Sequence, residues 1–409
     1  MKNKRTPDIR FPGFPGDWEQ CNLGNISTKI GSGKTPKGGN QNYKSEGIPL
    51  LRSQNIFNNK VNFNDVAYIT PEIDEDMANS RVQKGDVLLN ITGASIGRSA
   101  VYKLNHKANV NQHVSIIRPS SEVNPYFIQL NIASEKGQKQ IELNQAGGGR
   151  EGLNFQQIAK MAFYFPNLVE QGKIGDFFIQ LDNIIALLQQ ELTTLKQTKQ
   201  GFLQKMFPKE GESVPEVRFP GFTGEWEQRR LGEMLKERNE QIPENEEYPL
   251  MSFVQGTGVT PKGDRYDRSF LVKDDNKKYK KTELGDFIYS SNNLETGSIG
   301  FNKTGKAVIS PVYSIFSSKT KLESQFIGIL STRKDFIWKM VRFRQGVVYG
   351  QWRIHEKDFL DIQISVPSHN EQEEIIGFFA NLDNLITLHQ RELEVLKETK
   401  KAFLQKMFV

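Results

Sequence analysis

A glycine-rich segment near the start of the sequence carries residue types that bind phosphate. GSGKT at residues 31–35 matches the end of a phosphate-binding P-loop, whose backbone amides and lysine surround the phosphates of a nucleotide. The full motif also needs a glycine at the position of Thr28, and Pro36 prevents the helix that should follow. We therefore expect Lys34 and Thr35 to contact a DNA phosphate from a loop rather than to hold a nucleotide.

The other motifs that could form a catalytic centre are incomplete. NPYF at residues 124–127 is similar to the Asn-Pro-Pro-aromatic box of amino-methyltransferases but lacks the second proline, so we interpret it as the start of a helix. We find no nucleophile elbow and no pair of carboxylates with catalytic spacing. The histidines lack ligand spacing with cysteine or acidic residues, so we expect no metal site. They are His106, His113, His355, His369 and His389. The sequence therefore predicts a chain without catalytic residues.

Arginine, lysine and amide side chains gather instead in glycine-rich loops of both halves of the chain. Arginine can donate two hydrogen bonds to guanine O6 and N7, and asparagine or glutamine can pair with adenine N6 and N7. The candidate DNA contacts of the first half are Lys34, Thr35, Arg52, Gln54, Asn55, Asn90, Ser95, Arg98, Gln112, His113 and Arg150. Those of the second half are Gln255, Lys262, Asn292, Asn293, Arg344, Tyr349, Gln351, Trp352 and Arg353. The alternative for each one is a solvated loop side chain.

Two modules of similar plan must position these loops. After a loose polar tail at residues 1–9, residues 10–166 alternate short apolar runs with Gly, Asn and Pro, and include one helical segment after Pro125. Residues 218–367 repeat this plan. We expect two strand-rich α/β modules. Gly149-Arg150 aligns with Gly350-Gln351, so the equivalent loop presents different chemistry in each half.

The chain is an internal duplication. LDNIIALLQQELTTLKQTKQGFLQKMF, which begins at Leu181, returns as LDNLITLHQRELEVLKETKKAFLQKMF at Leu382, and most aligned positions are identical. RFPGFPGDWEQ at Arg10 returns as RFPGFTGEWEQ at Arg218. The segments between these repeats have diverged, so two similar scaffolds hold two different modules. This pattern suits a protein that recognises two different features at a fixed separation.

Apolar residues at heptad spacing follow each module and predict one long helix each, over residues 167–207 and 368–409. The first seam comprises Phe178, Leu181, Ile185, Leu188, Leu192, Leu195, Phe202 and Met206. The second comprises Phe379, Leu382, Ile386, Leu393, Leu396, Phe403 and Met407. Lys199, His389 and Lys400 occupy the remaining slots, where a polar residue specifies alignment. Pro208 ends the first helix, and residues 208–217 form a polar linker.

The two seams have each other as the nearest partner, because the tether makes their encounter intramolecular. We expect an α+β fold in which an intramolecular antiparallel coiled coil, a rod of roughly 55 Å, joins two α/β modules in a pseudo-two-fold arrangement. A homodimeric coiled coil without a spacing function is the alternative.

The bulk composition is compatible with a polyanionic partner. The formal net charge is +6 and the isoelectric point is about 9.0. The single cysteine, Cys21, excludes an internal disulfide framework and fits a reducing compartment. The start lacks the apolar core of a signal peptide, and no apolar run reaches the ~18 residues that span a bilayer. We expect a cytoplasmic protein without membrane contact.

In its motifs the chain closely resembles the specificity subunit of a type I restriction-modification enzyme. The resemblance rests on the duplicated RFPGF and WEQ motifs, on FPNLVEQGKI and VPSHNEQEEI with Glu170-Gln171 and Glu371-Gln372, and on the LDN-to-QKMF helices. GDVLLNITGASIGR and NQHVSIIRP add to it. The second module lacks the NQH string and the GGGREG loop, which leaves its DNA contacts less defined.

The resemblance implies two target recognition domains, each reading half of an asymmetric bipartite sequence in double-stranded DNA, with the helices setting the gap. It also implies two modification subunits that methylate adenine with S-adenosylmethionine and dock partly on the helices. Two restriction subunits, using ATP and Mg, would join them. This chain would itself be non-catalytic and hold no cofactor. The alternatives are a stand-alone nucleotide- or S-adenosylmethionine-dependent enzyme, and a coiled-coil adaptor that does not bind DNA.

Overall fold

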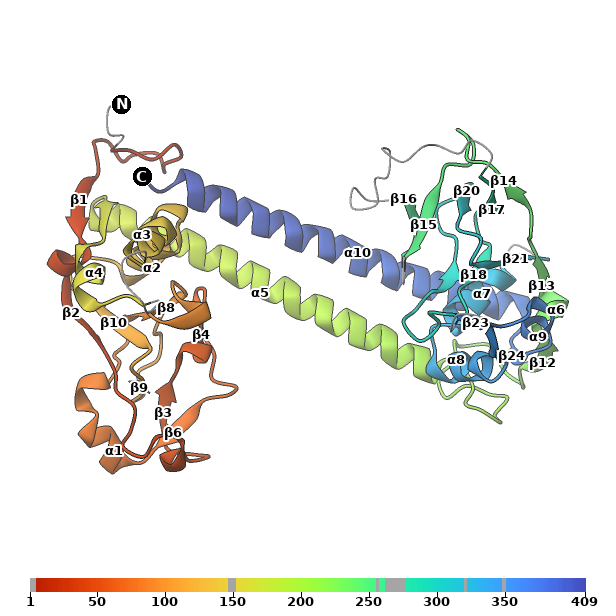
Figure 1. The fold of residues 1–409 in the computed structure, drawn as a ribbon, viewed down its shortest axis with the longest axis horizontal. Coiled ribbons are helices and arrows are strands. Elements are labelled where there is room, and N and C mark those ends of the chain that lie inside the picture. The colour runs from red at the N-terminus through yellow and green to blue at the C-terminus, as the bar shows by residue number, and fades with distance from the viewer. Residues whose placement is uncertain (1–4, 146–151, 255–256, 262–276, 320–321, 348–350) are drawn as a thin grey trace. The chain divides into compact units, whose positions relative to one another are not determined.

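The chain contains two helices of 38 residues, α5 (Leu168–Lys205) and α10 (His369–Lys406), in addition to its β-rich modules (Figure 1). The computed structural model describes residues 5–145, 152–254, 257–261, 277–319, 322–347 and 351–409. The chain divides into unit 1, which comprises Met1–Gln189 and Arg391–Val409, and unit 2, which comprises Gln190–Gln390. Each unit therefore contains one module, part of α5 and part of α10.

Unit 1 is built on a four-stranded sheet in the order β2-β10-β7-β8 and a three-stranded sheet in the order β6-β3-β9, with the pairs β1-β11 and β4-β5 beside them. Its strands are β1 (Glu19–Asn22), β2 (Ser27–Ser32), β3 (Ile48–Leu51), β4 (Ile56–Phe57), β5 (Lys60–Val61), β6 (Ala67–Ile69), β7 (Val87–Asn90), β8 (Ser99–Val101), β9 (Asn109–Val110), β10 (Val114–Pro119) and β11 (Ala162–Phe165). Its short helices are α1 (Pro71–Asp76), α2 (Pro125–Ala133), α3 (Glu135–Gln145) and α4 (Phe155–Lys160).

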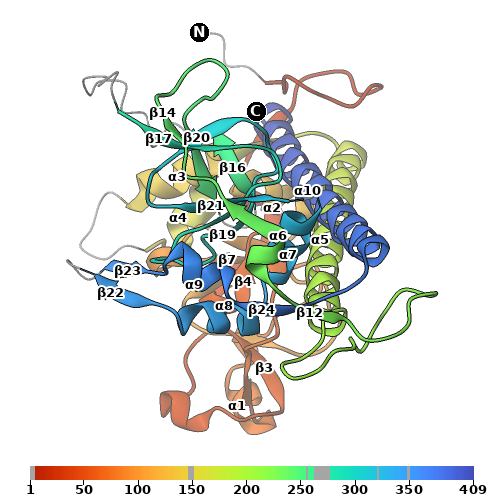
Figure 2. The same cartoon turned by 90° about the vertical axis from the view of Figure 1, so that its right-hand side faces the viewer.

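Unit 2 repeats the four-stranded sheet in the order β13-β21-β18-β19 and adds a three-stranded sheet, β14-β17-β20, with the pairs β12-β24, β15-β16 and β22-β23. Its strands are β12 (Glu227–Arg230), β13 (Leu235–Glu237), β14 (Gln241–Ile242), β15 (Met251–Val254), β16 (Gly258–Pro261), β17 (Tyr279–Thr282), β18 (Phe287–Tyr289), β19 (Ile299–Phe301), β20 (Ala307–Ile309), β21 (Ser314–Ser318), β22 (Gln345–Val347), β23 (Gln351–Arg353) and β24 (Gln363–Val366). Figure 2 shows its short helices, α6 (Leu231–Met234), α7 (Glu323–Leu330), α8 (Lys334–Val341) and α9 (Glu356–Leu360).

A buried ion pair in each unit accounts for two of the duplicated motifs. The guanidinium of Arg10 donates to both carboxylate oxygens of Glu170 at 2.6 and 2.8 Å, and Arg218 donates to Glu371 at 2.6 and 2.7 Å. The glutamate side chains are 0% and 1% exposed. Because a buried carboxylate needs a partner, the RFPGF arginine and the EQ glutamate depend on one another.

The heptad seam predicted from the sequence is the less exposed side of both helices. Every apolar residue assigned to it is buried or half-buried, whereas neighbours such as Leu187 and Leu388 are exposed. In unit 1 the rings of Phe177 and Phe403 meet edge to face at 5.1 Å, and in unit 2 those of Phe202 and Phe378 meet at 4.9 Å. The start of each helix therefore packs against the end of the other, which is an antiparallel pair.

Each helix is anchored by an aromatic residue just beyond its last turn. Phe408, after α10, packs against Phe127 and Phe178 in the core of unit 1. Phe207, after α5, packs against Trp226 and Phe326 in the core of unit 2. The repeated QKMF sequence therefore fixes the end of each helix in a hydrophobic core.

A further pair of equivalent contacts lies at the helix ends. In unit 2 the backbone N–H of Val217 donates to the carbonyl of Lys205 at 2.9 Å, so the chain that leaves α5 returns to it through the linker. In unit 1 the N–H of Ile9 donates to the carbonyl of Lys406 at 3.0 Å, which joins two remote parts of the sequence in the same way.

The α+β class with two long antiparallel helices, expected from the sequence, is confirmed. No helix in the described part of the chain is both long enough and apolar enough to cross a membrane.

Candidate nucleic-acid interface

Four loops of unit 1 that are far apart in the sequence are joined by hydrogen bonds. The side chain of Asn90 donates to the carbonyl of Ser53 at 2.8 Å, and the backbone of Asn111 donates to the carbonyl of Leu51 at 3.0 Å. These bonds connect the loops after β3, β7 and β9. The fourth loop follows β2, where the hydroxyl of Thr35 donates to Gln112. The structure therefore brings together most of the DNA contacts predicted for the first half.

His113 lies within this group of loops. Its Nε2 is 3.1 Å from Nε2 of Gln112, and its Nδ1 is 2.7 Å from the hydroxyl of Thr92. With the Gln112 amide donating, His113 accepts at Nε2 and donates from Nδ1. Gln112 is exposed and Thr35 holds its carbonyl oxygen, so the amide has a defined orientation at the surface.

Arg52 and Gln54 both bond to Asp65. The guanidinium of Arg52 donates to the carbonyl of Asp65 at 3.3 Å, and the amide of Gln54 donates to its carboxylate at 2.6 Å. Arg52 also stacks over Tyr43, with the guanidinium carbon 5.6 Å from the ring centroid. Neither Asp65 nor Tyr43 was predicted: Asp65 lies outside the glycine-rich loops, whereas Tyr43 lies in the glycine-rich segment 34–44 but is not a basic or amide residue.

Two predicted DNA contacts, Asn55 and Asn90, are corrected by the structure. They are 2% and 0% exposed. The amide nitrogen of Asn55 donates to the carbonyls of Asn62 and Asp65, and that of Asn90 donates to Ser53 and to the hydroxyl of Ser95. Their hydrogen bonds hold the loops in place, so these side chains cannot reach a base edge.

Two exposed basic side chains lie on segments of the joined loops, after β2 and after β7. Lys34 and Arg98 are exposed, and the guanidinium carbon of Arg98 lies 5.9 Å from the ring centroid of Phe57, which is itself 42% exposed. An arginine held against an aromatic ring is positioned while its N–H groups stay free to donate. Phe57 was not predicted, although an aromatic residue in the IFNNKV turn is a signal that could have identified it.

Unit 2 has a corresponding but chemically different group. The side chain of Asn292 accepts from the backbone N–H of Trp352 at 2.6 Å, and the hydroxyl of Ser291 accepts from that of Ile354 at 3.0 Å. These bonds hold the β22–β23 hairpin, which stands at the edge of unit 2 (Figure 2), against the loop after β18. Asn293, Trp352 and Arg353 remain exposed.

Arg344 is a third correction. Its guanidinium donates to both oxygens of Glu295 at 2.5 and 2.7 Å, and the Arg344 side chain is only 9% exposed. The hydrogen bond from Arg344 holds the pKa of Glu295 below its ordinary value. With Nη1 and Nη2 donating to Glu295 and its guanidinium carbon 6.0 Å from the ring centroid of Trp352, Arg344 supports the hairpin rather than offering these two groups to guanine.

Several predicted contacts are not placed. Arg150, Gln255, Lys262 and Tyr349 lie outside the described residues, and Gln351 is assigned only to β23.

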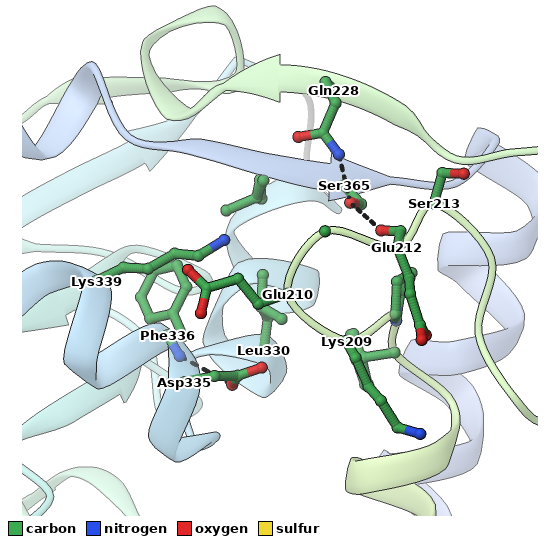
Figure 3. A pocket seen from close by; sticks show the side chains of 14 residues that line it. Lys209, Glu210, Glu212, Ser213, Gln228, Leu330, Asp335, Phe336, Lys339 and Ser365 are labelled. Carbon is green, nitrogen blue, oxygen red and sulfur yellow. Dashed lines mark hydrogen bonds between the residues drawn. The ribbon is translucent and has the colours of Figure 1, made fainter.

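A cavity of about 380 Å³ lies in unit 2, away from these loops. Figure 3 shows the linker residues Lys209 and Glu212 on one side and Asp335 and Lys339 of α8 on the other, with the side chain of Glu210 reaching from the linker toward Lys339. The carboxylate of Asp335 accepts from Arg333 and is thereby neutralised. We assign this cavity no ligand. Within the described residues, no group of three or more His, Cys, Asp or Glu side chains could hold a metal ion.

Comparison with known proteins gives one consistent result. The family model described as type I restriction modification DNA specificity domain matches residues 15–197 and again residues 223–398. The chain is 25% identical over 411 residues to the putative type I restriction enzyme MjaX specificity subunit of Methanocaldococcus jannaschii, covering 96% of this chain and 92% of the relative. It is 26% identical over 202 residues to the EcoBI specificity subunit of Escherichia coli, covering 47% and 42% respectively.

Two solved structures share the fold. The S subunit of a type I restriction-modification system from M. genitalium superposes with a TM-score of 0.64 at 13% identity, covering 99% of each chain. A chain from a structural study of the assembly and conformational transition of the type I restriction-modification system superposes with a TM-score of 0.51 at 14% identity, covering 96% of this chain and 97% of the other.

Proposed function

Because the chain belongs to the family of type I restriction-modification DNA specificity domains, we propose that each of its two modules reads one half of an asymmetric bipartite DNA target. The resemblance, the role as a specificity subunit and the non-catalytic assignment expected from the sequence agree with the family and are confirmed. The stand-alone enzyme and the adaptor without DNA binding are set aside.

The observation that carries the proposal is the joining of the loops in unit 1. Gln112 and Arg98 are exposed on loops whose backbones are tied down, by the N–H of Asn111 to the carbonyl of Leu51 and by the N–H of Gly97 to the carbonyl of Asn90. Pre-ordered loops lose less conformational entropy on binding, and both side chain types can pair with base edges in the major groove. In unit 2 the exposed groups are Trp352, Arg353 and Asn293, so we expect a different half-site there.

The helix pair is the natural spacer between half-sites. Two half-sites read from one face of DNA lie about one helical turn apart, roughly 34 Å centre to centre. The register of the seam fixes how the helices align, and the Phe207 and Phe408 anchors fix each helix end in its core. We infer that the gap between half-sites is set by these features.

The outward sides of the helices suit partner subunits. Leu187 and Ile184 on α5, and Leu388 and Leu385 on α10, are between 43% and 56% exposed and occupy equivalent positions in the repeat. Since the stripe occurs twice, two modification subunits would dock on it. These subunits would carry S-adenosylmethionine and methylate adenine. Two restriction subunits, with ATP and Mg, would complete the complex.

The test is to co-express the chain with its modification subunits in cells that lack adenine methylation, and to sequence the methylated adenines. We expect one asymmetric bipartite motif, present only when this chain is present. Methylation that is independent of the chain, or methyl transfer by the isolated chain, would refute the proposal.

A residue-level version uses Arg98→Ala in the same cells. Losing a base contact should cost about 1–3 kcal/mol and relax the sequence preference of one half-site only. The control is Lys84→Ala, at the opposite end of β7, which should leave both half-sites unchanged. An equal loss on all sequences would mark Arg98 as a phosphate contact.

A further inference from the structure

Two aspartates at equivalent positions of the repeat each connect α5, α10 and the module of their unit. In unit 1, Oδ1 of Asp182 on α5 accepts from Nζ of Lys400 on α10, and Oδ2 accepts from Nδ2 of Asn59 at 3.1 Å. In unit 2, Oδ1 of Asp383 on α10 accepts from Nζ of Lys199 on α5. Its Oδ2 accepts from Nζ of Lys303 at 3.1 Å. We call these two groups the unit 1 junction and the unit 2 junction.

The helical members of the two junctions are related by the repeat, but the module members are not. Asn59 lies in the β4–β5 turn with a φ of 65°, and its backbone N–H donates to the carbonyl of Ser99 at 2.9 Å. Lys303 follows β19. Two diverged modules thus reach the same helical carboxylate from different places in their folds.

The residue of unit 1 that corresponds to Lys303 has another role. Lys103 follows β8 as Lys303 follows β19, and these strands hold the same place in their sheets. Lys103 lies over the ring of Tyr126, with Nζ 5.5 Å from the centroid, and lines a small cavity that it shares with Asn59 and Asp182. The contact to the aspartate has therefore been kept although the residue that makes it has changed.

We propose that the junctions are positioning elements that fix the orientation of each module on the helix pair and thereby restrict the gap between half-sites. This inference rests on the proposed bipartite reading. One carboxylate binds a lysine of the seam and a donor of the module, so helix register and module orientation are set by the same atoms. Each base pair added to the gap shifts one half-site by about 3.4 Å along the DNA axis and rotates it by roughly 34° about that axis. A loosened module would therefore accept neighbouring gaps.

The unit 2 junction offers the sharper experiment. Lys303→Met keeps most of the aliphatic chain and removes the ammonium group, whose nitrogen also lies 5.1 Å from the ring centroid of Phe301. Methylation would be measured with the complete complex of this chain and its modification subunits, on duplexes with the preferred gap and with gaps one base pair shorter and longer. We expect the preference for the correct gap to fall about two- to fivefold, the range of one partly exposed ion pair, with the base preferences of both half-sites unchanged.

Two control variants test whether a change in gap preference comes from the orientation of the module rather than from the loss of a charge or of stability. Lys306→Met removes the same charge from the same unit, but Lys306 binds Glu247 rather than a helix, so the gap preference should stay as in the wild type. Lys303→Arg keeps a donor for Asp383 and should restore the preference. An unchanged gap preference in Lys303→Met, or an equal change in Lys306→Met, would overturn the proposal.

If Lys303→Met fails to fold, the unit 1 junction provides an independent experiment. Asn59→Gly removes the amide while accommodating the positive φ, and Asn58→Gly in the same turn is its control. A relaxed gap in Asn59→Gly alone supports the junction, and no difference between the two variants contradicts it. If the wild-type complex shows no gap preference at all, the bipartite function fails rather than the junction.

Discussion

The carboxylates of Glu170 and Glu371 are withdrawn from water, and each is neutralised by one arginine of the duplicated RFPGF motif. Arg10 also donates to the carbonyl of Gly16 at 2.6 Å, and Arg218 donates to that of Gly224 at 2.6 Å. At the scale of single residues, the most similar parts of the two repeats are thus explained by buried charge that must be matched.

The buried ion pair gives a direct prediction at this scale. Glu371→Gln leaves the guanidinium of Arg218 without its counter-charge, and breaking a buried pair costs about 3–5 kcal/mol. Glu373→Gln, two residues along the same helix, removes an exposed carboxylate and should cost less than about 0.5 kcal/mol. Urea denaturation of both variants checks the difference. Equal stability of the two would contradict a structural role for the Arg218–Glu371 pair.

A second buried carboxylate links stability to pH. Burial would raise the pKa of Asp74, but hydrogen bonds from Arg81 at 2.7 and 3.0 Å and from Asn109 at 2.6 Å outweigh it, so the pKa lies below its ordinary value. The unfolded chain then binds the proton first as the pH falls. The stabilisation is therefore fully present above the unfolded pKa of about 3.9 and is lost as the pH falls through the folded pKa.

The variant Asp74→Asn tests whether the stabilisation by Asp74 is lost as the pH falls. The variant should be less stable than the wild type by roughly 3 kcal/mol at neutral pH, and the difference should shrink below about pH 4. Thermal melts of both proteins from pH 3 to pH 7 measure it. A difference that stays constant over this range would show that the ionised carboxylate does not contribute.

At the scale of elements, the long helices have an inner and an outer apolar side. Leu188 is half-buried in the seam, whereas its neighbour Leu187 is 56% exposed. The two residues are of one type and differ only in the side of the helix on which they lie. They therefore separate helix pairing from partner docking.

Leu188→Ala should destabilise the protein by about 1–2 kcal/mol, below the range for a fully buried leucine. Leu187→Ala should leave stability within about 0.5 kcal/mol but weaken binding of the modification subunits. Denaturation and titration with modification subunits measure the two effects. The assignment fails if Leu187→Ala destabilises as much as Leu188→Ala.

The helices and the strand-rich modules could be predicted because their signals are local or periodic. The heptad of Leu181 to Met206 needs no knowledge of the rest of the fold. The fate of a loop side chain depends on partners that are remote in the sequence. Asn90 is buried and donates a hydrogen bond to the carbonyl of Ser53, and Arg344 forms an ion pair with Glu295. Composition alone marked these residues as DNA contacts, and it could not distinguish a residue that holds a loop from one that the loop displays.

At the scale of the whole molecule, helix length and target spacing should change together. Adding seven residues to both helices, after Glu191 in α5 and after Gln390 in α10, keeps the heptad seam and lengthens the pair by ~10 Å. We expect a gap about three base pairs longer. Sequencing of methylated adenines reads this out. Four residues inserted into one helix alone should alter the permitted gap with a loss of activity, and an unchanged gap in both designs would contradict the spacing role.

The backbone hydrogen bond from Val217 to Lys205 and the one from Ile9 to Lys406 occupy equivalent places at the ends of α5 and α10. After α5 a continuous linker connects the two bonded residues. After α10 no peptide connects them, because Ile9 lies near the start of the sequence. The contacts at the helix ends therefore do not depend on which module comes first in the sequence. We expect that a polypeptide opened within residues 209–212, with Val409 joined to Arg5 by a short linker, keeps the contacts at both helix ends and, on the proposed function, reads the same target.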